Sequence, residues 1–284
     1  MANEPVTEVN GQESVNVERV RVPDTVYGEL SELTGELAKV NPKETAVHYA
    51  ILGEDGKVIG TLPTTRYKAI IEATDNEHIY GVVSARYKLI NHREIMSRVV
   101  PQLQQAGLKH QQTYINGGKM FSTWLSEKQT TIKVGDIVQL GVLVRNSIDG
   151  SMGFGIDFYA VRLACMNGMV HSSSLAPSLR KRHTALCLDN IEQALADILL
   201  KIDEIVHVYR MAAITSITVE DMKKLVENLN LPKYVTDDVL KNTPTNVWQA
   251  YNDLTYIITR SDASMSSQVQ YWSEAERLLR VVVH

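Results

Sequence analysis

Cysteine is scarce in this chain of 284 residues, which contains only Cys165 and Cys187. Two cysteines in apolar surroundings indicate buried free thiols, and a chain of this length can bury a sizeable core without disulfide cross-links. Long hydrophobic runs are missing too, because no apolar stretch reaches the roughly 18 residues that span a bilayer and no apolar signal region is present. We therefore expect a cytoplasmic protein that does not enter a membrane.

The familiar catalytic motifs are also missing. The sequence has no Walker loop, no GxGxxG after a strand, no HExxH and no CxxC, and its eight histidines lack metal-ligand spacing. Asp136, Asp149 and Asp157 could gather around a metal ion, although aspartate is ordinary in turns. We expect no cofactor, no metal and no enzymatic activity, and a metal-dependent nuclease stays open as one alternative.

Charge is distributed unevenly along the chain. The net charge is −4, but residues 1–59 carry −6, residues 60–185 carry +7 and residues 186–284 carry −5. A basic segment between two acidic ones is typical of a protein that binds a polyanion. The alternative is that these basic side chains are scattered over a solvated sheet.

The periodicity of apolar residues divides the chain into three regions. Residues 1–40 form a flexible, polar and acidic N-terminal segment that ends in a short helix. Residues 41–183 alternate with period two between glycine-rich turns, which predicts one antiparallel sheet with a helix at 92–106 packed on one face. Residues 184–284 change to period 3.6 and predict a separate cluster of helices. The expected fold class is α+β, with an antiparallel β-sheet core, a packed helix and an all-helical C-terminal region.

Two local signals refine this prediction. Apolar residues from 188 to 209 fall on one face of a single long helix. Asn146–Ser151 (NSIDGS) has the residue types of a tight turn between two strands. There we expect Asp149 to accept hydrogen bonds from backbone amides and Gly150 to adopt a positive φ.

Basic and aromatic side chains follow the predicted strands. Arg86 and Lys88 lie two apart on a strand predicted for residues 78–90, so they should share a face. Tyr114 and Phe121 lie on the neighbouring hairpin, where aromatic rings could stack on bases. The candidate DNA-binding residues are Arg66, Lys68, Arg86, Lys88, Lys119, Arg145, Arg162, Arg180, Lys181, Arg182, Tyr87 and Trp124.

A structural alternative applies to several of these residues. The aromatic rings could belong to the core rather than to a binding surface. Arg145 and Arg162 could pair with Asp149 or Asp157 inside the fold, which would remove their charges from the surface.

Five short blocks of the middle region form an ordered set: Ala85–Glu94 (ARYKLINHRE), Asn116–Phe121 (NGGKMF), Asn146–Ser151 (NSIDGS), Val161–Asn167 (VRLACMN) and Arg182–Thr184 (RHT). In the same order, these blocks resemble those of the phage/plasmid-like protein family, a domain-of-unknown-function family of phages and plasmids. The resemblance covers roughly residues 80–260, and Ile148 stands where the family usually has histidine. A hairpin sheet beside a helix is also remotely similar to the single-strand annealing proteins of phage recombination.

This resemblance and the basic middle region imply a phage or plasmid DNA-metabolism protein. We expect it to bind single-stranded DNA in the host cytoplasm and to act in recombination or strand annealing without nucleotide hydrolysis. We expect a homo-oligomer, because annealing needs many contacts and the apolar faces of residues 188–209 and 265–283 exceed what one small sheet covers. The alternatives are a phage structural or host-takeover protein that contacts other proteins, and a metal-dependent nuclease.

Overall fold

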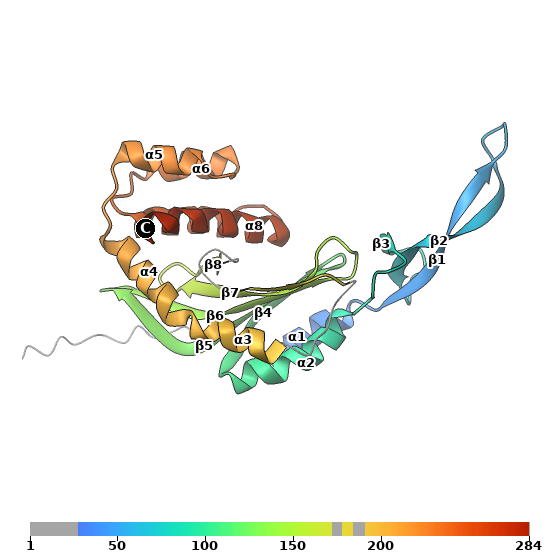
Figure 1. Ribbon diagram of the computed structural model, residues 1–284, viewed down its shortest axis with the longest axis horizontal. Coiled ribbons are helices and arrows are strands. Elements are labelled where there is room, and N and C mark those ends of the chain that lie inside the picture. Colours follow the sequence, from blue (N-terminus) through green and yellow to red (C-terminus); the bar gives the residue numbers. More distant parts are fainter. Residues whose placement is uncertain (1–27, 172–177, 184–190, 284) are drawn as a thin grey trace, which may run out of the picture.

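The computed structural model describes residues 28–171, 178–183 and 191–283 (Figure 1). The chain forms two antiparallel sheets and a series of helices, and the helices gather in the C-terminal region. The predicted α+β fold class is therefore confirmed. The predicted single sheet is wrong, because the strands divide into a three-stranded and a six-stranded sheet.

The smaller sheet follows a short helix, α1 (Leu30–Ala38). Its strand order is β1-β2-β3, and the Gly53 amide donates to the Lys57 carbonyl across the first turn (2.8 Å). The strands are β1 (Pro42–Leu52), β2 (Val58–Glu72) and β3 (Ile79–Ser84). Beyond the reach of β3, residues 48–63 form a two-stranded hairpin that projects from the molecule, and we call this segment the arm (Figure 1).

The third strand is shorter than the sequence pattern predicts. It ends at Ser84, and the Tyr87 amide donates to the Ser84 carbonyl (2.9 Å) as the chain turns. Arg86 therefore lies in a turn, and Lys88 follows it in a loop. The prediction that these two residues share one strand face is wrong, because the turn carries Tyr87 into the interior instead.

Helix α2 (His92–Gln105) agrees with the sequence prediction. The Asn91 side chain caps it by accepting a hydrogen bond from the Glu94 amide (2.7 Å). Its apolar positions recur at helical spacing and are buried.

The larger sheet forms the centre of the molecule. Its order is β4-β5-β6-β7-β8, and β9 pairs with β7. Figure 1 shows α1, α2 and α3 on one side of this sheet and α8 on the other. The strands are β4 (Leu108–Asn116), β5 (Lys119–Lys133), β6 (Asp136–Ser147), β7 (Phe154–Arg162), β8 (Asn167–His171) and β9 (Leu179–Lys181).

The C-terminal region is helical, as predicted. The expected single helix over 188–209 is instead divided at Lys201, because α3 packs against β7 while α4 packs against β5. The helices are α3 (Ile191–Leu200), α4 (Ile202–Ile214), α5 (Val219–Glu227), α6 (Lys233–Lys241), α7 (Val247–Thr259), α8 (Met265–Ala275) and the 3₁₀-helix η2 (Glu276–Val282).

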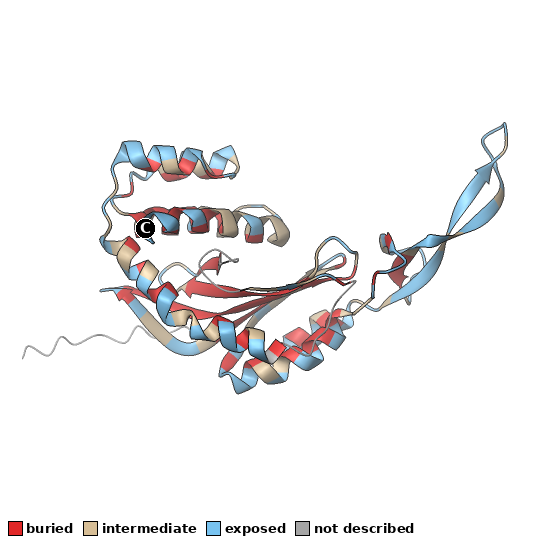
Figure 2. Cartoon of the chain, in the orientation of Figure 1, coloured by how far each residue is buried: buried red, intermediate tan, exposed pale blue. Residues whose placement is uncertain are grey.

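These helices do not form a separate cluster, so that part of the prediction is wrong. One hydrophobic core extends from α1 through the larger sheet to η2. Figure 2 shows the central strands as buried, and β6 is buried over nearly its whole length. A mostly apolar run such as Ile137–Val144, which Gln139 alone interrupts with a polar side chain, is typical of a strand covered on both faces. That run was the sequence signal for helices on both sides of the sheet.

Candidate nucleic-acid interface

Basic side chains from three segments meet where the smaller sheet joins the larger one. The Ala85 amide donates to the Arg66 carbonyl (2.9 Å), which places β2 beside the turn that carries Arg86. The Lys88 amide donates to the His183 carbonyl (3.1 Å), which places the following loop beside the end of β9. We call this set the basic junction: Arg66, Lys68, Arg86, Lys88, Arg180, Lys181 and Arg182.

Most of the charge at the basic junction is not neutralised by acidic side chains. Lys68 pairs with Glu44 (2.6 Å), and Arg180 lies 3.6 Å from Asp157. The other members form no ion pair with any described residue: Arg66, Arg86, Lys88, Lys181 and Arg182. Four of these five side chains are exposed, and Lys181 is half-buried. This part of the surface can therefore contact an anionic ligand without first breaking an internal ion pair.

A buried polar cluster holds these segments together. The Asn146 side-chain amide donates to Nδ1 of His92 (3.0 Å) and to the Ile90 carbonyl (3.3 Å). Its oxygen lies 2.9 Å from Nε2 of His183, whose Nδ1 lies 3.2 Å from the Lys88 carbonyl. Three of the sequence blocks meet here, so their buried residues position the exposed basic ones. We call Asn146, His92 and His183 the histidine clasp.

Burial disfavours the charged form of both histidines in the histidine clasp. Burial and, to a smaller extent, the proximity of His183 together lower the pKa of His92 to about 4. Burial also lowers the pKa of His183, although its contact with the Lys88 carbonyl opposes that shift. Both oxygens beside His183 only accept, so its neutral ring donates to one of them at a time, either the Asn146 side chain or the Lys88 carbonyl.

Tyr87 belongs to this interior and not to a stacking surface. Only 7% of the residue is exposed. Its hydroxyl donates to the Ser147 carbonyl (3.0 Å), and its ring stacks on His183 at 4.9 Å between centroids. The prediction that Tyr87 stacks on bases is not compatible with this position, because the ring is already covered by the imidazole.

Trp124 is a second correction. It is fully buried in the larger core, and its indole N–H donates to the Ser122 hydroxyl (2.9 Å). A tryptophan with a satisfied N–H and no exposed face cannot stack on a base. The structural alternative was correct for both aromatic residues.

The Asn146–Ser151 turn has the predicted structural role. The Ser151 amide donates to Oδ1 of Asp149 (2.8 Å), and Gly150 has a φ of 77°. A Cβ atom on Gly150 would lie 2.7 Å from Cγ1 of Val83, so the turn packs closely on β3. The turn therefore joins the two sheets beside the basic junction.

Arg145 lies mostly beneath the surface. Its Nε atom is 2.7 Å from Oδ2 of Asp157, which is fully buried. Burial raises the pKa of Asp157, and the guanidiniums of Arg145 and Arg180 oppose that shift. The alternative that Arg145 pairs inside the fold is confirmed. The single Asp157 carboxylate faces both the Arg145 and the Arg180 guanidinium, so a net positive charge remains near Arg180.

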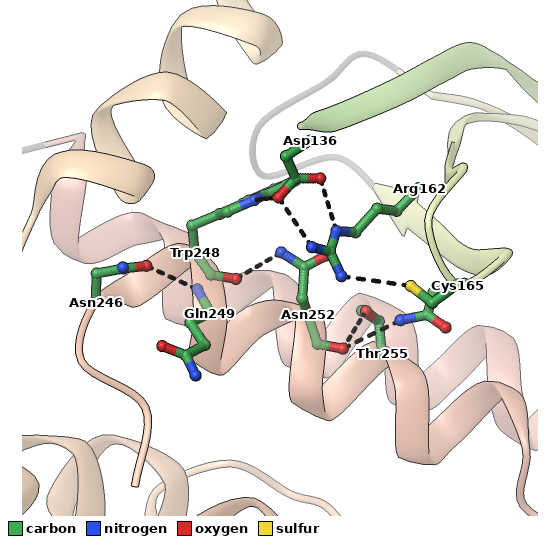
Figure 3. Close-up of polar contacts among 9 residues, drawn as sticks. Asp136, Arg162, Cys165, Asn246, Trp248, Gln249, Asn252 and Thr255 are labelled. Carbon is green, nitrogen blue, oxygen red and sulfur yellow. Dashed lines mark hydrogen bonds and ion pairs between the residues drawn. The ribbon is translucent and has the colours of Figure 1, made fainter. Parts of the chain in front are cut away.

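Arg162 lies at the other end of β7, where it anchors the helical region. Its Nε donates to Oδ1 of Asp136 (2.7 Å), and Nη2 donates to Oδ2 (3.0 Å). The Trp248 indole on α7 donates to the same carboxylate (2.8 Å), and Asn252 donates to the Trp248 carbonyl (2.7 Å) (Figure 3). The prediction of Arg162 as a DNA contact is therefore not supported by its position.

The block VRLACMN also ends in a residue, Asn167, that connects the larger sheet to the helical region. The Asn167 side chain donates to the Asn252 carbonyl (3.2 Å), and Nη1 of Arg260 donates to the Asn167 side-chain oxygen (2.9 Å). These bonds join β8 to α7 within the core. Neither the acceptor on α7 nor the donor Arg260, which directly follows α7, could be identified from the sequence, because both lie more than 80 positions away along the chain.

The remaining predicted residue, Lys119, lies at the start of β5. It lines a hollow beside Tyr80 and Asp149, near the turn that packs on β3. Tyr114 is exposed at the same hairpin, whereas Phe121 is buried.

The three aspartates do not gather into one site. Asp136 pairs with Arg162, Asp149 belongs to its own turn, and Asp157 pairs with Arg145. Within the described ranges, no group of three or more His, Cys, Asp or Glu residues is placed to hold a metal ion. The metal-dependent nuclease alternative required these three aspartates to gather around one metal ion, and their positions do not support it.

These observations define an α+β protein with an unneutralised basic surface between two antiparallel sheets. The chain belongs to the family described as "Domain of unknown function (DUF932)", which matches residues 79–277, from β3 to η2. The predicted membership of a domain-of-unknown-function family is thereby confirmed. No curated protein and no solved structure matches the chain. Among the described helices, none has the length and apolar character needed to cross a membrane.

Proposed function

We propose that this protein binds single-stranded DNA through the basic junction. The observation that supports the proposal is the gathering of five basic side chains, from three distant segments, without an acidic partner among the described residues. Neutralising phosphates releases condensed counterions and supplies most of the affinity in sequence-independent binding. The proposed context is phage or plasmid DNA metabolism in the host cytoplasm, with strand annealing or recombination as the outcome.

The form of the surface favours a single strand over a duplex. Proteins usually read the major groove of a duplex with a helix or a β-ribbon. The cations of the basic junction lie instead on a strand, a turn, a loop and a strand end at the base of the arm. Basic side chains spread over several short segments are better suited to following a flexible backbone.

A triple substitution tests this proposal. We expect Arg86→Gln, Lys88→Gln and Arg182→Gln together to weaken binding to a labelled oligo-dT strand of about 30 nucleotides. Each lost phosphate contact should reduce the slope of log K against log salt by about 0.7, so the slope should fall by roughly 2. Fluorescence anisotropy over a range of NaCl concentrations measures both quantities.

The matched control removes the same charge elsewhere. Lys133, Lys223 and Lys233 are exposed and lie outside the basic junction, so their triple change to Gln should leave most of the affinity intact. Equal losses in the two triple variants would show that net charge, and not this surface, governs binding.

The arm favours a second role, which is contact with another protein chain. Its outer part exposes six apolar side chains: Tyr49, Ile51, Leu52, Val58, Ile59 and Leu62. Exposed apolar patches on a projecting hairpin usually mark an interface. We propose that the partner is another copy of this chain, because annealing requires several binding surfaces along one strand.

A further inference from the structure

Two adjoining hollows lie between the β4–β5 hairpin and the start of α8. Their volumes are about 610 Å³ and about 340 Å³. Five residues line both of them, so they form one continuous depression, which we call the hairpin groove: Tyr114, Asn116, Phe121, Ser264 and Met265. Neither the basic junction nor the histidine clasp contributes a residue to it.

Aromatic side chains form much of the larger hollow. Tyr114 is 40% exposed and presents its ring to a ligand, whereas Phe121, Tyr159 and Trp272 lie nearly buried in the walls. Burial raises the pKa of Tyr159, so its hydroxyl stays protonated at neutral pH. A planar, uncharged ligand is therefore suited to this part of the groove.

Two buried polar atoms of the larger hollow have no hydrogen-bond partner in the described chain. One is the indole Nε1 of Trp272, a residue that is only 3% exposed, and the other is Oε1 of Gln111. A buried donor or acceptor without a partner costs about 1–3 kcal/mol. A ligand that offers both an acceptor and a donor would satisfy the two atoms together.

The charges of the groove are divided between its two parts. Among the residues that the structure describes, Asp262 is the only charged one that lines the larger hollow, whereas Lys119 lines the smaller one together with Asp149. Lys119 forms no ion pair with another described residue. The aromatic part of the groove thus carries one carboxylate, and the other part carries one available cation beside the Asp149 carboxylate, which accepts from Ser151 within its own turn.

We propose that the hairpin groove holds an unstacked base of the single strand, so this inference rests on the proposed function. The base stacks on Tyr114, a base carbonyl accepts from the Trp272 indole, and a base N–H donates to the Gln111 oxygen. The adjacent phosphate lies at Lys119. Bases satisfy this combination of stacking and edge hydrogen bonds. An extended peptide along β4 would use backbone groups and would need no neighbouring cation.

The test compares an oligo-dT strand with an abasic strand of equal length, which keeps the phosphates and lacks the bases. Tyr114→Leu should weaken oligo-dT binding roughly five- to hundredfold, as expected for the loss of one stacked base, and should leave abasic binding unchanged. Tyr234→Leu, which removes a similarly exposed tyrosine on α6, is the matched control and should change neither.

A second variant tests the hydrogen bond. Trp272→Phe removes the indole donor and keeps an aromatic ring, so we expect several-fold weaker oligo-dT binding with abasic binding unchanged. Because Trp272 is buried, its thermal unfolding is measured in parallel. If that variant unfolds, the exposed Tyr114 decides the outcome.

The outcomes separate the two proposals. If the wild-type protein binds neither strand, the proposed function fails and this inference fails with it. If it binds oligo-dT and Tyr114→Leu binds it equally well, the base site is wrong while single-strand binding stands. An equal loss on the abasic strand would place the backbone, and not a base, in the groove.

Discussion

Asn146 shows how a single side chain determines the geometry of the proposed surface. Its amide contacts His92 and Ile90 on one segment and His183 on another. These contacts set the backbone positions from which Arg86, Lys88 and Arg182 project. The buried residues of the sequence blocks thus have a structural role, and their exposed neighbours are the residues available to a ligand.

The histidine clasp predicts acid sensitivity. Unfolded His92 takes up a proton as the pH falls below 6.5, whereas folded His92 does so only near its pKa of about 4. The free energy of unfolding therefore keeps its full value, as far as His92 affects it, above pH 6.5. It falls by up to about 3 kcal/mol as the pH drops from 6.5 to about 4. Urea unfolding at about pH 7 and about pH 4.5 measures the loss.

A substitution isolates the responsible group. His92→Gln should be less stable at neutral pH and should lose less stability on acidification, because its side chain does not titrate. His207→Gln, at an exposed histidine of α4, is the control and should behave as the wild type does. Equal acid losses in the wild type and His92→Gln would remove His92 as the cause.

At the scale of elements, the arm is the part of the fold that receives the least stabilisation from packing within its own subunit. The sheet at its base is completed by β3, and the Asn146–Ser151 turn packs on that strand. The arm itself is a two-stranded hairpin, exposed along most of its length (Figure 2). An isolated hairpin is at best marginally stable in water, so a partner that covers its apolar side chains would stabilise it.

This reasoning predicts that the arm controls assembly. Ile59→Lys with Leu62→Lys should lower the molar mass found by light scattering, because charges would replace apolar side chains at the proposed contact. Ile59 is 70% exposed and Leu62 is similarly open, so the stability of the subunit should change by no more than about 0.5 kcal/mol each.

Exposed apolar residues elsewhere supply the control. Leu200→Lys with Ile214→Lys changes two equally exposed residues on α3 and α4 and should leave the molar mass unchanged. A monomeric wild-type protein, or equal effects of the two pairs, would refute assembly through the arm.

At the scale of the whole molecule, the helical region and the larger sheet depend on each other. The apolar faces that suggested an oligomer interface are buried against the same chain, from Ile191 to Tyr209 and from Val269 to Leu279. The prediction that these helices hold subunits together therefore loses its basis. Their role in this structure is to complete the core.

Deletion of residues 262–284 should consequently unfold the subunit rather than dissociate an oligomer. The deletion removes α8 and η2, which contribute the buried side chains of Trp272, Leu278 and Leu279. Each large buried side chain contributes about 2–5 kcal/mol, and the sum is comparable to the total stability of a domain. We expect thermal melting, followed by circular dichroism, to show no cooperative transition.

The control shortens the arm instead. Replacing residues 49–62 by a short turn removes side chains that are mostly exposed, and the melting temperature should change little. A truncated protein that still melts cooperatively, close to the wild-type temperature, would contradict a shared core.

The sequence alone determined the features that depend on neighbours a few residues apart. The change from period two to period 3.6, the cap at Asn91 and the positive φ of Gly150 were all predictable, because each follows from local hydrogen bonding or backbone sterics. The basic character of the middle region was predictable in the same way.

The tertiary structure decided which of the candidate residues are available to a ligand. Arg162 and Arg86 look alike in the sequence, but Arg162 pairs with Asp136, which also accepts from the Trp248 indole, while Arg86 stays exposed. Tyr87 and Tyr114 differ in the same way, because one ring is covered by His183 and the other opens into a groove. A side chain's partner is chosen by the chain topology, which brings distant segments together, and the order of residues does not show that choice.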